Sequence, residues 1–115
     1  MSAATQPIQA ARDIKLDSTI SEMCGVTMND SVEGRIVAQI METKPGVKVT
    51  YYPAMIRIDG QGKLEFDMAE ISEALGRTMD PYTFQVEMST HYGRMVLFED
   101  RILLFGKMED AAAYE

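Results

Sequence analysis

The chain has 115 residues, 46% of them hydrophobic and 25% charged, and it carries a formal net charge of −7. This size and composition predict a single globular domain with one modest core. The acidic balance argues against nucleic acid as a partner, because binding to phosphates requires a basic face. No apolar run approaches the roughly 18–20 residues of a membrane-spanning helix, so we expect no membrane insertion.

Cysteine use and the start of the chain both bear on location. Cys24 is the only cysteine, so no intramolecular disulfide can form, and this favours a reducing compartment. The polar residues 1–11 lack the apolar stretch of a signal peptide. We therefore expect a cytoplasmic protein. We expect Cys24 itself to be a partly buried small residue, with a redox role as the alternative.

Methionine is unusually frequent, with ten residues and no tryptophan. Flexible thioether side chains are common on adaptable binding surfaces, but they also fill irregular gaps in cores. The two interpretations differ in whether Met41, Met55, Met88 and Met95 lie on exposed faces.

The first part of the chain predicts an arm, a strand and a helix. Residues 1–23 are mostly small or polar with weak periodicity, and we expect a flexible N-terminal arm. A short strand is expected over residues 26–28. Asp30 and Glu33 have the spacing of a reciprocal N-cap, which predicts an amphipathic helix over residues 31–43. Its apolar stripe consists of Val32, Ile36, Val37, Ile40 and Met41.

Two strands and a hairpin are expected next. Apolar residues alternate over 47–51 and again at Ile56 and Ile58, with Pro53 separating the two runs. The dipeptide Asp59-Gly60 favours a hairpin turn. We expect Leu64 and Phe66 to lie on the returning strand.

The C-terminal half begins with a second helix. Asp67 and Glu70 repeat the capping pattern, and Gly76 suits the C′ position, which predicts a helix over residues 68–75. We expect its buried stripe to consist of Met68, Ile71, Ala74 and Leu75.

Strands follow this helix. Phe84, Val86 and Met88 alternate with polar residues and predict a half-buried strand. Apolar residues over 96–98 and 102–105 predict a hairpin closed by Glu99-Asp100. Residues 109–114 are expected to form one helical turn.

Interleaved helices and antiparallel strands predict an α+β fold. We expect a single compact domain of small antiparallel sheets with two to three helices. The domain is predicted to span residues 24–115, with the arm of residues 1–23 before it.

No catalytic constellation is visible in the sequence. His91 is the only histidine, and neighbouring strand residues point to opposite faces, so adjacency to Thr90 does not predict a catalytic pair. Glu70 and Glu73 have a spacing found in carboxylate metal sites, but no histidine completes the set. We therefore predict no catalytic residue, metal ligand or cofactor.

Residues 89–93 are the best candidates for binding. We expect them to form a loop rich in hydroxyl groups, with Tyr92 as an amphipathic anchor and Arg94 as a planar hydrogen-bond donor. The alternative is a surface loop whose hydroxyl groups satisfy only local backbone groups.

Three stretches of the chain resemble a known family. They are Asp59-Gly60-x-Gly62-Lys63, Glu70-Ile71-Ser72-Glu73-x-Leu75-Gly76-Arg77 and Phe84-x-Val86-x-x-Ser89-Thr90-x-x-Gly93-Arg94. The chain is similar to the coupling, or effector, proteins of soluble multicomponent diiron monooxygenases. This family includes methane monooxygenase regulatory protein B and the phenol hydroxylase effector. Within this family, the run Ser89-Thr90-His91-Tyr92-Gly93-Arg94, with its bulky His91 and Tyr92, looks most like the propane and alkene monooxygenase branch.

The resemblance implies a function without catalysis or a cofactor of its own. Family members have an α/β fold with about three helices, and they dock on a diiron hydroxylase that also receives electrons from an NADH-dependent reductase. They alter substrate access, oxygen reactivity and electron coupling. The arm corresponds to a tail that orders on the hydroxylase in the methane branch. The partner-binding residues that the resemblance implies are Glu87, Ser89, Thr90, Gly93 and Arg94. We add Met88, His91 and Tyr92 to the predicted partner-binding set.

Our hypothesis is a coupling protein for oxidation of a short-chain hydrocarbon of propane or alkene type, with residues 24–115 as its effector domain. The alternative is a self-contained regulatory module that binds a small molecule. That alternative predicts a ligand pocket and no dependence on a hydroxylase.

Overall fold

The structure is a computed structural model that describes residues 22–114. Residues 1–21 of the predicted arm and the C-terminal Glu115 lie outside the described residues. The first described strand begins at Met23, the last residue of the predicted arm.

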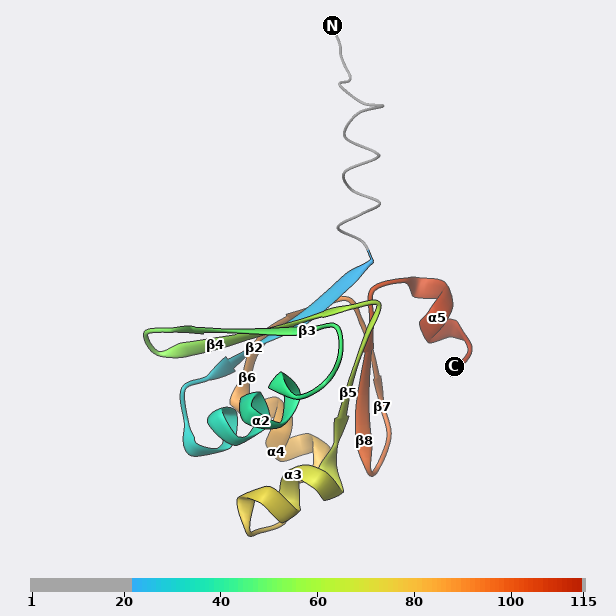
Figure 1. The fold of residues 1–115 in the computed structure, drawn as a ribbon. Coiled ribbons are helices and arrows are strands. Elements are labelled where there is room, and N and C mark those ends of the chain that lie inside the picture. Colours follow the sequence, from blue (N-terminus) through green and yellow to red (C-terminus); the bar gives the residue numbers. More distant parts are fainter. Residues whose placement is uncertain (1–21, 115) are drawn as a thin grey trace, which may run out of the picture.

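The strands form two antiparallel sheets, and the chain passes from one to the other at the turn between β4 and β5 (Figure 1). The first has four strands in the order β3-β4-β2-β6 and the second has three in the order β5-β8-β7. The four-stranded sheet contains β2 (Met23–Asn29), β3 (Val47–Tyr52), β4 (Met55–Gln61) and β6 (Met88–Tyr92). The three-stranded sheet contains β5 (Lys63–Asp67), β7 (Arg94–Leu97) and β8 (Arg101–Phe105).

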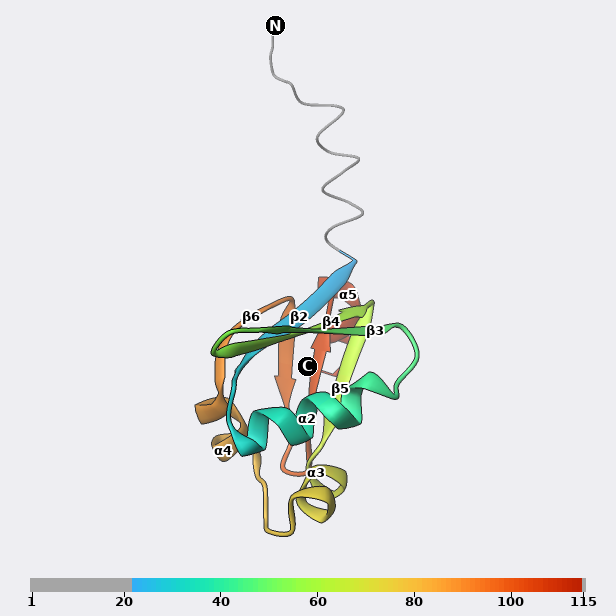
Figure 2. The same cartoon turned by 60° about the vertical axis from the view of Figure 1, so that its left-hand side comes forward.

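Three helices lie on the same side of the four-stranded sheet, and a fourth lies beside the other sheet (Figures 1 and 2). The three are α2 (Val32–Glu42), which packs on β3 and β4, α3 (Met68–Leu75), which packs on α2, β5 and β8, and α4 (Pro81–Glu87), which contacts β6. The fourth is α5 (Met108–Ala112). The α+β prediction is confirmed, although the described residues contain four helices instead of two to three. Among the described elements, no helix covers the opposite face of the four-stranded sheet, which we call the open face.

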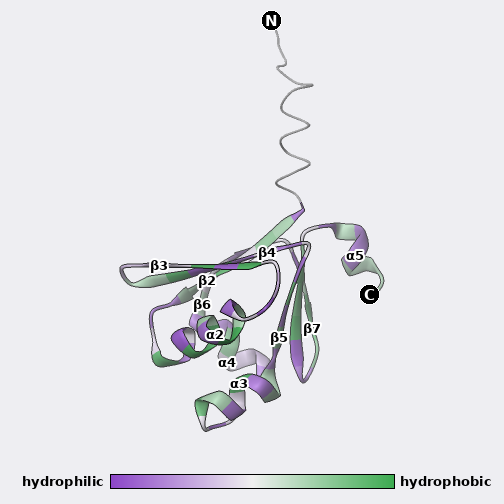
Figure 3. Cartoon of the chain, viewed as in Figure 1, coloured by the Kyte–Doolittle hydropathy of each residue, from purple (hydrophilic) through white to green (hydrophobic). Residues whose placement is uncertain are grey.

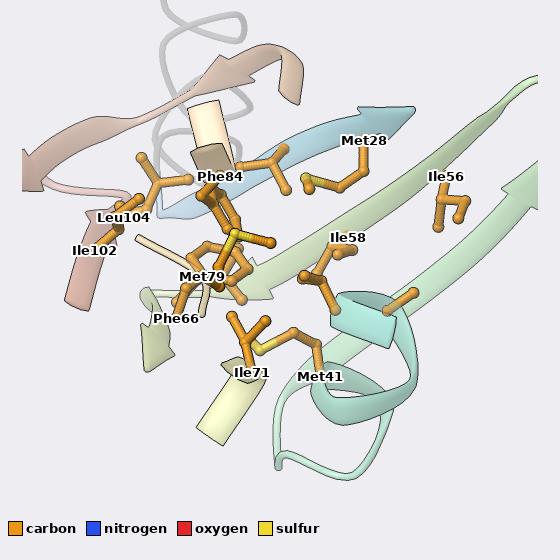
Figure 4. Packing of buried hydrophobic residues seen from close by; sticks show 14 of the residues in the cluster. Met28, Met41, Ile56, Ile58, Phe66, Ile71, Met79, Phe84, Ile102 and Leu104 are labelled. Carbon is orange, nitrogen blue, oxygen red and sulfur yellow. The ribbon is translucent and has the colours of Figure 1, made fainter. Parts of the chain in front are cut away.

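The core lies between the two sheets and the three helices (Figure 4). Alternate residues of β2 and β4 point into it, and so do alternate residues of β5 and β8, because successive strand residues face opposite ways. Both helices α2 and α3 carry apolar and polar patches (Figure 3). The largest fully buried side chains include Phe66, Phe84, Met28, Ile56, Ile58 and Leu104.

The four methionines considered above divide between the core and the surface. Met41 is buried, Met88 and Met95 are half-buried against the core, and Met55 is exposed. Most of these thioethers therefore fill the core, and Met55 alone of the four is classed as exposed.

Helix α2 matches the prediction except at its first turn. Ser31 is the N-cap and accepts a 3.0 Å hydrogen bond from the backbone N–H of Gly34. Asp30 instead pairs with Arg35, whose Nε lies 2.6 Å from Asp30 Oδ1. The reciprocal cap predicted for Asp30 is therefore wrong by one residue. Val32 is also exposed rather than part of the buried stripe.

Helix α3 begins and ends as predicted. The Asp67 side chain accepts hydrogen bonds from the backbone N–H groups of Ala69 and Glu70, and Gly76 ends the helix with φ of 83°. Met68 and Ile71 are buried as expected. Ala74 is exposed, so its predicted place in the buried stripe is wrong.

The hairpin predicted at Asp59-Gly60 is absent. Strand β4 runs through both residues, and the chain turns only at Gly62, where φ is 85°. The next strand, β5, then leaves for the other sheet and pairs with β8. Gly60 serves close packing instead of a turn, because a Cβ there would lie 2.4 Å from Leu64 Cδ2.

The strand predicted at residues 84–88 is instead helix α4 followed by β6. The Asp80 side chain accepts a 2.7 Å hydrogen bond from the backbone N–H of Thr83, and Pro81 suits the first helical position. Phe84 faces the core while Val86 is exposed, as a helix turn requires. The hairpin of β7 and β8 and the short C-terminal helix confirm the remaining predictions.

Candidate functional site

The predicted binding residues lie along one continuous segment at the edges of both sheets. Glu87 ends α4, residues 88–92 form β6, Gly93 bends the chain, and Arg94 begins β7. The predicted loop is therefore an edge strand, which is held in place by antiparallel pairing with β2. A strand fixes these side chains more firmly than a loop would.

The strand divides the predicted residues between two faces of the sheet. Thr90 pairs with Thr27 and Tyr92 pairs with Gly25, on the open face. His91 pairs with Val26, so its side chain points to the side of the sheet opposite Thr90 and Tyr92, where it remains exposed at the sheet edge. Thr90 and His91 thus do not form a catalytic pair.

The open face of the sheet is lined mostly by polar residues from all four strands. Paired positions place Lys48, Asp59, Gly25 and Tyr92 in one cross-strand row, and Thr50, Arg57, Thr27 and Thr90 in the next. This face is the candidate functional site.

On this face, the side chain of Tyr92 reaches from the edge strand β6 to two charged residues of β4, Asp59 and Arg57. Its hydroxyl donates a 2.6 Å hydrogen bond to Asp59 Oδ1, and the guanidinium of Arg57 donates to the same oxygen at 2.9 Å. The Arg57 guanidinium carbon also lies 5.9 Å from the Tyr92 ring centroid. Burial, followed by the hydrogen bond to Asp59, raises the pKa of Tyr92 to about 12. The same carboxylate raises the pKa of Arg57.

Gly25 provides the space for this arrangement. A Cβ at Gly25 would lie 2.6 Å from Tyr92 Cε1 and 2.6 Å from Asp59 Oδ1. Real Cβ atoms do not approach other heavy atoms so closely, so the ring and the carboxylate rest directly over the glycine. A glycine in the middle of a strand often marks such a close approach.

Three of the predicted residues have local structural contacts. The Ser89 hydroxyl donates a 3.0 Å hydrogen bond to Asn29 Oδ1, and the Ser31 hydroxyl donates at 2.6 Å to Glu87. Met88 is half-buried and packs against the core. These contacts tie α4 and the start of β6 to the neighbouring strand and helix. The Ser89 hydroxyl bonds a distant side chain, and not a local backbone group as the alternative interpretation expected.

Gly93 connects the two sheets. Its φ is 102°, and a Cβ would lie 2.6 Å from the Phe105 carbonyl oxygen and 2.8 Å from Cys24 Cβ. Only glycine fits this conformation and this space. The bend itself therefore requires glycine at position 93, whether or not this residue contacts a partner.

Arg57, Asp59 and Gly25 belong to the site although sequence reasoning did not select them. The signal was the polar alternation of Arg57 and Asp59 with Ile56 and Ile58, which indicates one solvated strand face. The dipeptide Asp59-Gly60 was interpreted as a turn instead. The partner of Asp59, Tyr92, is 33 residues away in the chain.

The chemistry of the open face is that of recognition. Among residues 22–114, no group of three or more His, Cys, Asp or Glu side chains is placed to hold a metal ion. In the same part of the chain, no helix combines the length and apolar composition needed to cross a membrane. Hydroxyl groups, the aromatic rings of Tyr52 and Tyr92 and an ion pair offer a surface that can bind another protein.

A second feature is an open, mainly apolar groove between α4 and the β7–β8 hairpin. Its volume is about 780 Å³, and it is lined by Asp80, Pro81, Tyr82, Gln85, Leu97, Phe98 and Glu99. Under the alternative of a small-molecule module, this groove is one candidate site for the ligand.

Comparison with known proteins assigns the chain to a family. The sequence profile described as the MmoB/DmpM family matches residues 22–105. The chain belongs to the MmoB/DmpM family. This confirms the resemblance found in the sequence.

Two curated relatives have the same kind of name. The effector component of propane 2-monooxygenase from Gordonia sp. (strain TY-5) is 48% identical over 98 residues, covering 85% of this chain and 88% of the relative. The corresponding component from Rhodococcus jostii (strain RHA1) is 51% identical over 94 residues, covering 82% and 83%. Both are named effector components and not catalytic subunits, which confirms the prediction of a non-catalytic component.

A solved structure of this family shares the fold. A chain in the structure of the phenol hydroxylase–regulatory protein complex superposes with a TM-score of 0.66 at 25% identity. The match covers 72% of this chain and 97% of that chain. This MmoB/DmpM protein is thus an effector component of the multicomponent monooxygenase type.

Proposed function

We propose that this MmoB/DmpM protein docks on the diiron hydroxylase of a short-chain hydrocarbon monooxygenase, of propane or alkene type. Docking changes substrate access and oxygen activation in the hydroxylase, and it couples electrons from an NADH-dependent reductase to product formation. The effector itself carries no cofactor. The identity of about half with two propane 2-monooxygenase effector components is the observation that carries this proposal.

The open face supports docking through β6. Thr90 and Tyr92 lie at the edge of a sheet face that the described helices leave uncovered. A rigid strand presents them in fixed positions, which lowers the ordering cost of binding. The net charge of −7 suits a partner with a positively charged docking surface, because opposite charge speeds encounter.

Regulation by docking requires a difference in affinity. The effector shifts the hydroxylase toward one state only to the extent that it binds that state more tightly. The effect on coupling therefore depends on contacts that exist in one hydroxylase state and are lost in the other.

Reconstitution of the monooxygenase tests this function. The hydroxylase and reductase from the same organism are mixed with substrate and NADH, and the effector is added from zero to excess. We expect product formation to rise to a maximum near one effector per active site, with product approaching the NADH consumed. A flat response, with no complex on size-exclusion chromatography, would contradict the proposal.

The alternative of a self-contained small-molecule module is tested with the purified effector alone. A ligand of the groove beside α4 would raise the melting temperature of the isolated effector through mass action. A clear rise with a metabolite, together with a flat reconstitution response, would favour the alternative.

A further inference from the structure

We propose that Asp59 and Arg57 are positioning residues that fix the side chain of Tyr92 on the open face before the hydroxylase binds. This inference rests on the proposed docking function and extends it to residues outside the β6 segment. Arg57 and Asp59 come from β4, and β2 separates that strand from β6.

The geometry constrains Tyr92 at both ends of its side chain. At the ring, the absence of a Cβ on Gly25 lets Tyr92 approach the backbone of β2 closely, with Cε1 2.6 Å from the place a Cβ would occupy. At the hydroxyl, the 2.6 Å hydrogen bond to Asp59 fixes the direction of the side chain. A ring held at both ends is restricted to one rotamer, although Tyr92 remains 38% exposed.

Arg57 keeps this hydrogen bond in place. Without a cation, the half-buried carboxylate of Asp59 would favour solvent or a charged partner over a tyrosine hydroxyl. The Arg57 guanidinium, 2.9 Å from the same oxygen, balances that charge and also approaches the ring.

Arg57 occupies this position at a local cost. Its Nε is buried and has no hydrogen-bond partner among the described residues. An unsatisfied buried donor destabilises a fold, so stability alone does not explain the arrangement. Polar groups without a hydrogen-bond partner are expected at functional sites, where a fixed geometry matters more than stability.

The consequence for docking is preorganisation. A mobile exposed tyrosine loses rotamer freedom when a partner binds it, whereas a fixed tyrosine has lost that freedom already. The inference therefore predicts that Asp59 affects the affinity for the hydroxylase only through Tyr92.

A double-mutant cycle on the affinity tests this dependence. Dissociation constants for the hydroxylase are measured for the wild type, Asp59→Ala, Tyr92→Ala and the double variant. We expect Asp59→Ala to weaken binding roughly two- to tenfold in the wild type, the range for freeing one side chain, and to have no further effect in the Tyr92→Ala background. Equal weakening in both backgrounds would overturn the positioning role. Asp100→Ala removes an exposed carboxylate at the tip of the β7–β8 hairpin and is the matched control, with no expected change.

An independent readout needs no hydroxylase. The phenol absorbance of Tyr92 is followed from pH 9 to 13, and Tyr92→Phe identifies its contribution. Burial, followed by the hydrogen bond and the charge of Asp59, raises the pKa of Tyr92 to about 12. We expect this pKa to fall in Asp59→Ala by the part that Asp59 contributes, and to stay unchanged in Asp100→Ala. An unchanged pKa in Asp59→Ala would also overturn the inference.

The two experiments separate the possible failures. If the wild type does not bind the hydroxylase, the docking function is contradicted, even when the absorbance titration shows the Tyr92–Asp59 contact. If the wild type binds and the Asp59 effect is independent of Tyr92, only the positioning role is overturned. Circular dichroism of each variant verifies that the sheet has folded.

Discussion

The aromatic rings of Phe66 and Phe84 pack with their centroids 4.8 Å apart and their planes tilted by 48°. Phe66 comes from β5 and Phe84 from α4, and both are fully buried. This contact joins the three-stranded sheet to the helix that leads directly into β6. The position of β6 therefore depends on a core contact that lies on the side of the four-stranded sheet opposite the open face.

Loss of the Phe84 ring should destabilise the whole domain. Phe84→Ala removes the aromatic pair and leaves a cavity, so we expect the free energy of unfolding to fall by about 3–5 kcal/mol. Urea denaturation measures this change. Tyr82→Ala, on the exposed side of the same helix, is the control and should change stability by less than about 0.5 kcal/mol. A similar effect of both substitutions would contradict the packing described here.

Local signals predicted some elements of this fold well. Helix α3 was predicted correctly because Asp67 and Gly76 mark its two ends within the sequence itself. Helix α4 was misassigned because the alternation of Phe84, Val86 and Met88 over only five residues fits a strand as well as a helix. The N-cap signal of Asp80-Pro81 was present and favoured the helix.

Long-range contacts explain what sequence reasoning missed. The turn preference of Asp59-Gly60 is outweighed by pairing of β4 with strands on both of its sides. The Asp59–Tyr92 contact depends on the order of strands in the sheet, which no local pattern specifies. The segment 87–94 was therefore predicted as the candidate site, while the residues that hold Tyr92 were not.

Cys24 should be chemically inert in the folded protein. Its side chain is fully buried, and burial, followed by the negative charge of Asp59, raises the pKa of the thiol to about 11. Because the thiolate is the reactive form, a thiol reagent at pH 8 should react slowly with the native protein and fully in denaturant. Thr78→Cys places a thiol at an exposed position and is the positive control. Rapid reaction of native Cys24 would favour the redox alternative.

The bend between β6 and β7 should not tolerate a side chain. In Gly93→Ala, the left-handed backbone costs about 1–2 kcal/mol. Contact with the Phe105 carbonyl adds about 1–3 kcal/mol of overpacking. Gly76→Ala is the matched control, because Gly76 also has positive φ but a Cβ there would meet nothing within 4 Å. Urea denaturation should rank Gly93→Ala as clearly the more destabilising, and the reverse order would be inconsistent with the described bend.

Stability at high pH should depend on Tyr92. Its folded pKa of about 12 lies above the ordinary tyrosine value of 10.0, so folding favours the protonated phenol. The contribution of Tyr92 to stability is therefore full below about pH 10, and it is lost as the pH rises toward 12. The free energy of unfolding is measured for wild type and Tyr92→Phe from pH 9 to 11.5. We expect the wild type to lose more stability than Tyr92→Phe as the pH rises. Parallel curves for the two proteins would contradict the raised pKa.

Hydrogen–deuterium exchange of the effector with and without the hydroxylase tests most directly whether β6 and the open face form the docking surface. Among the described strands, β6 is at the edge of its sheet and pairs only with β2, so the backbone amides that point away from β2 are available for a docked partner to shield. We expect slower exchange in residues 88–94 on addition of the hydroxylase, and little change in α5. Protection confined to α5 or to the groove beside α4 would contradict the docking surface, and no protection anywhere would contradict docking itself.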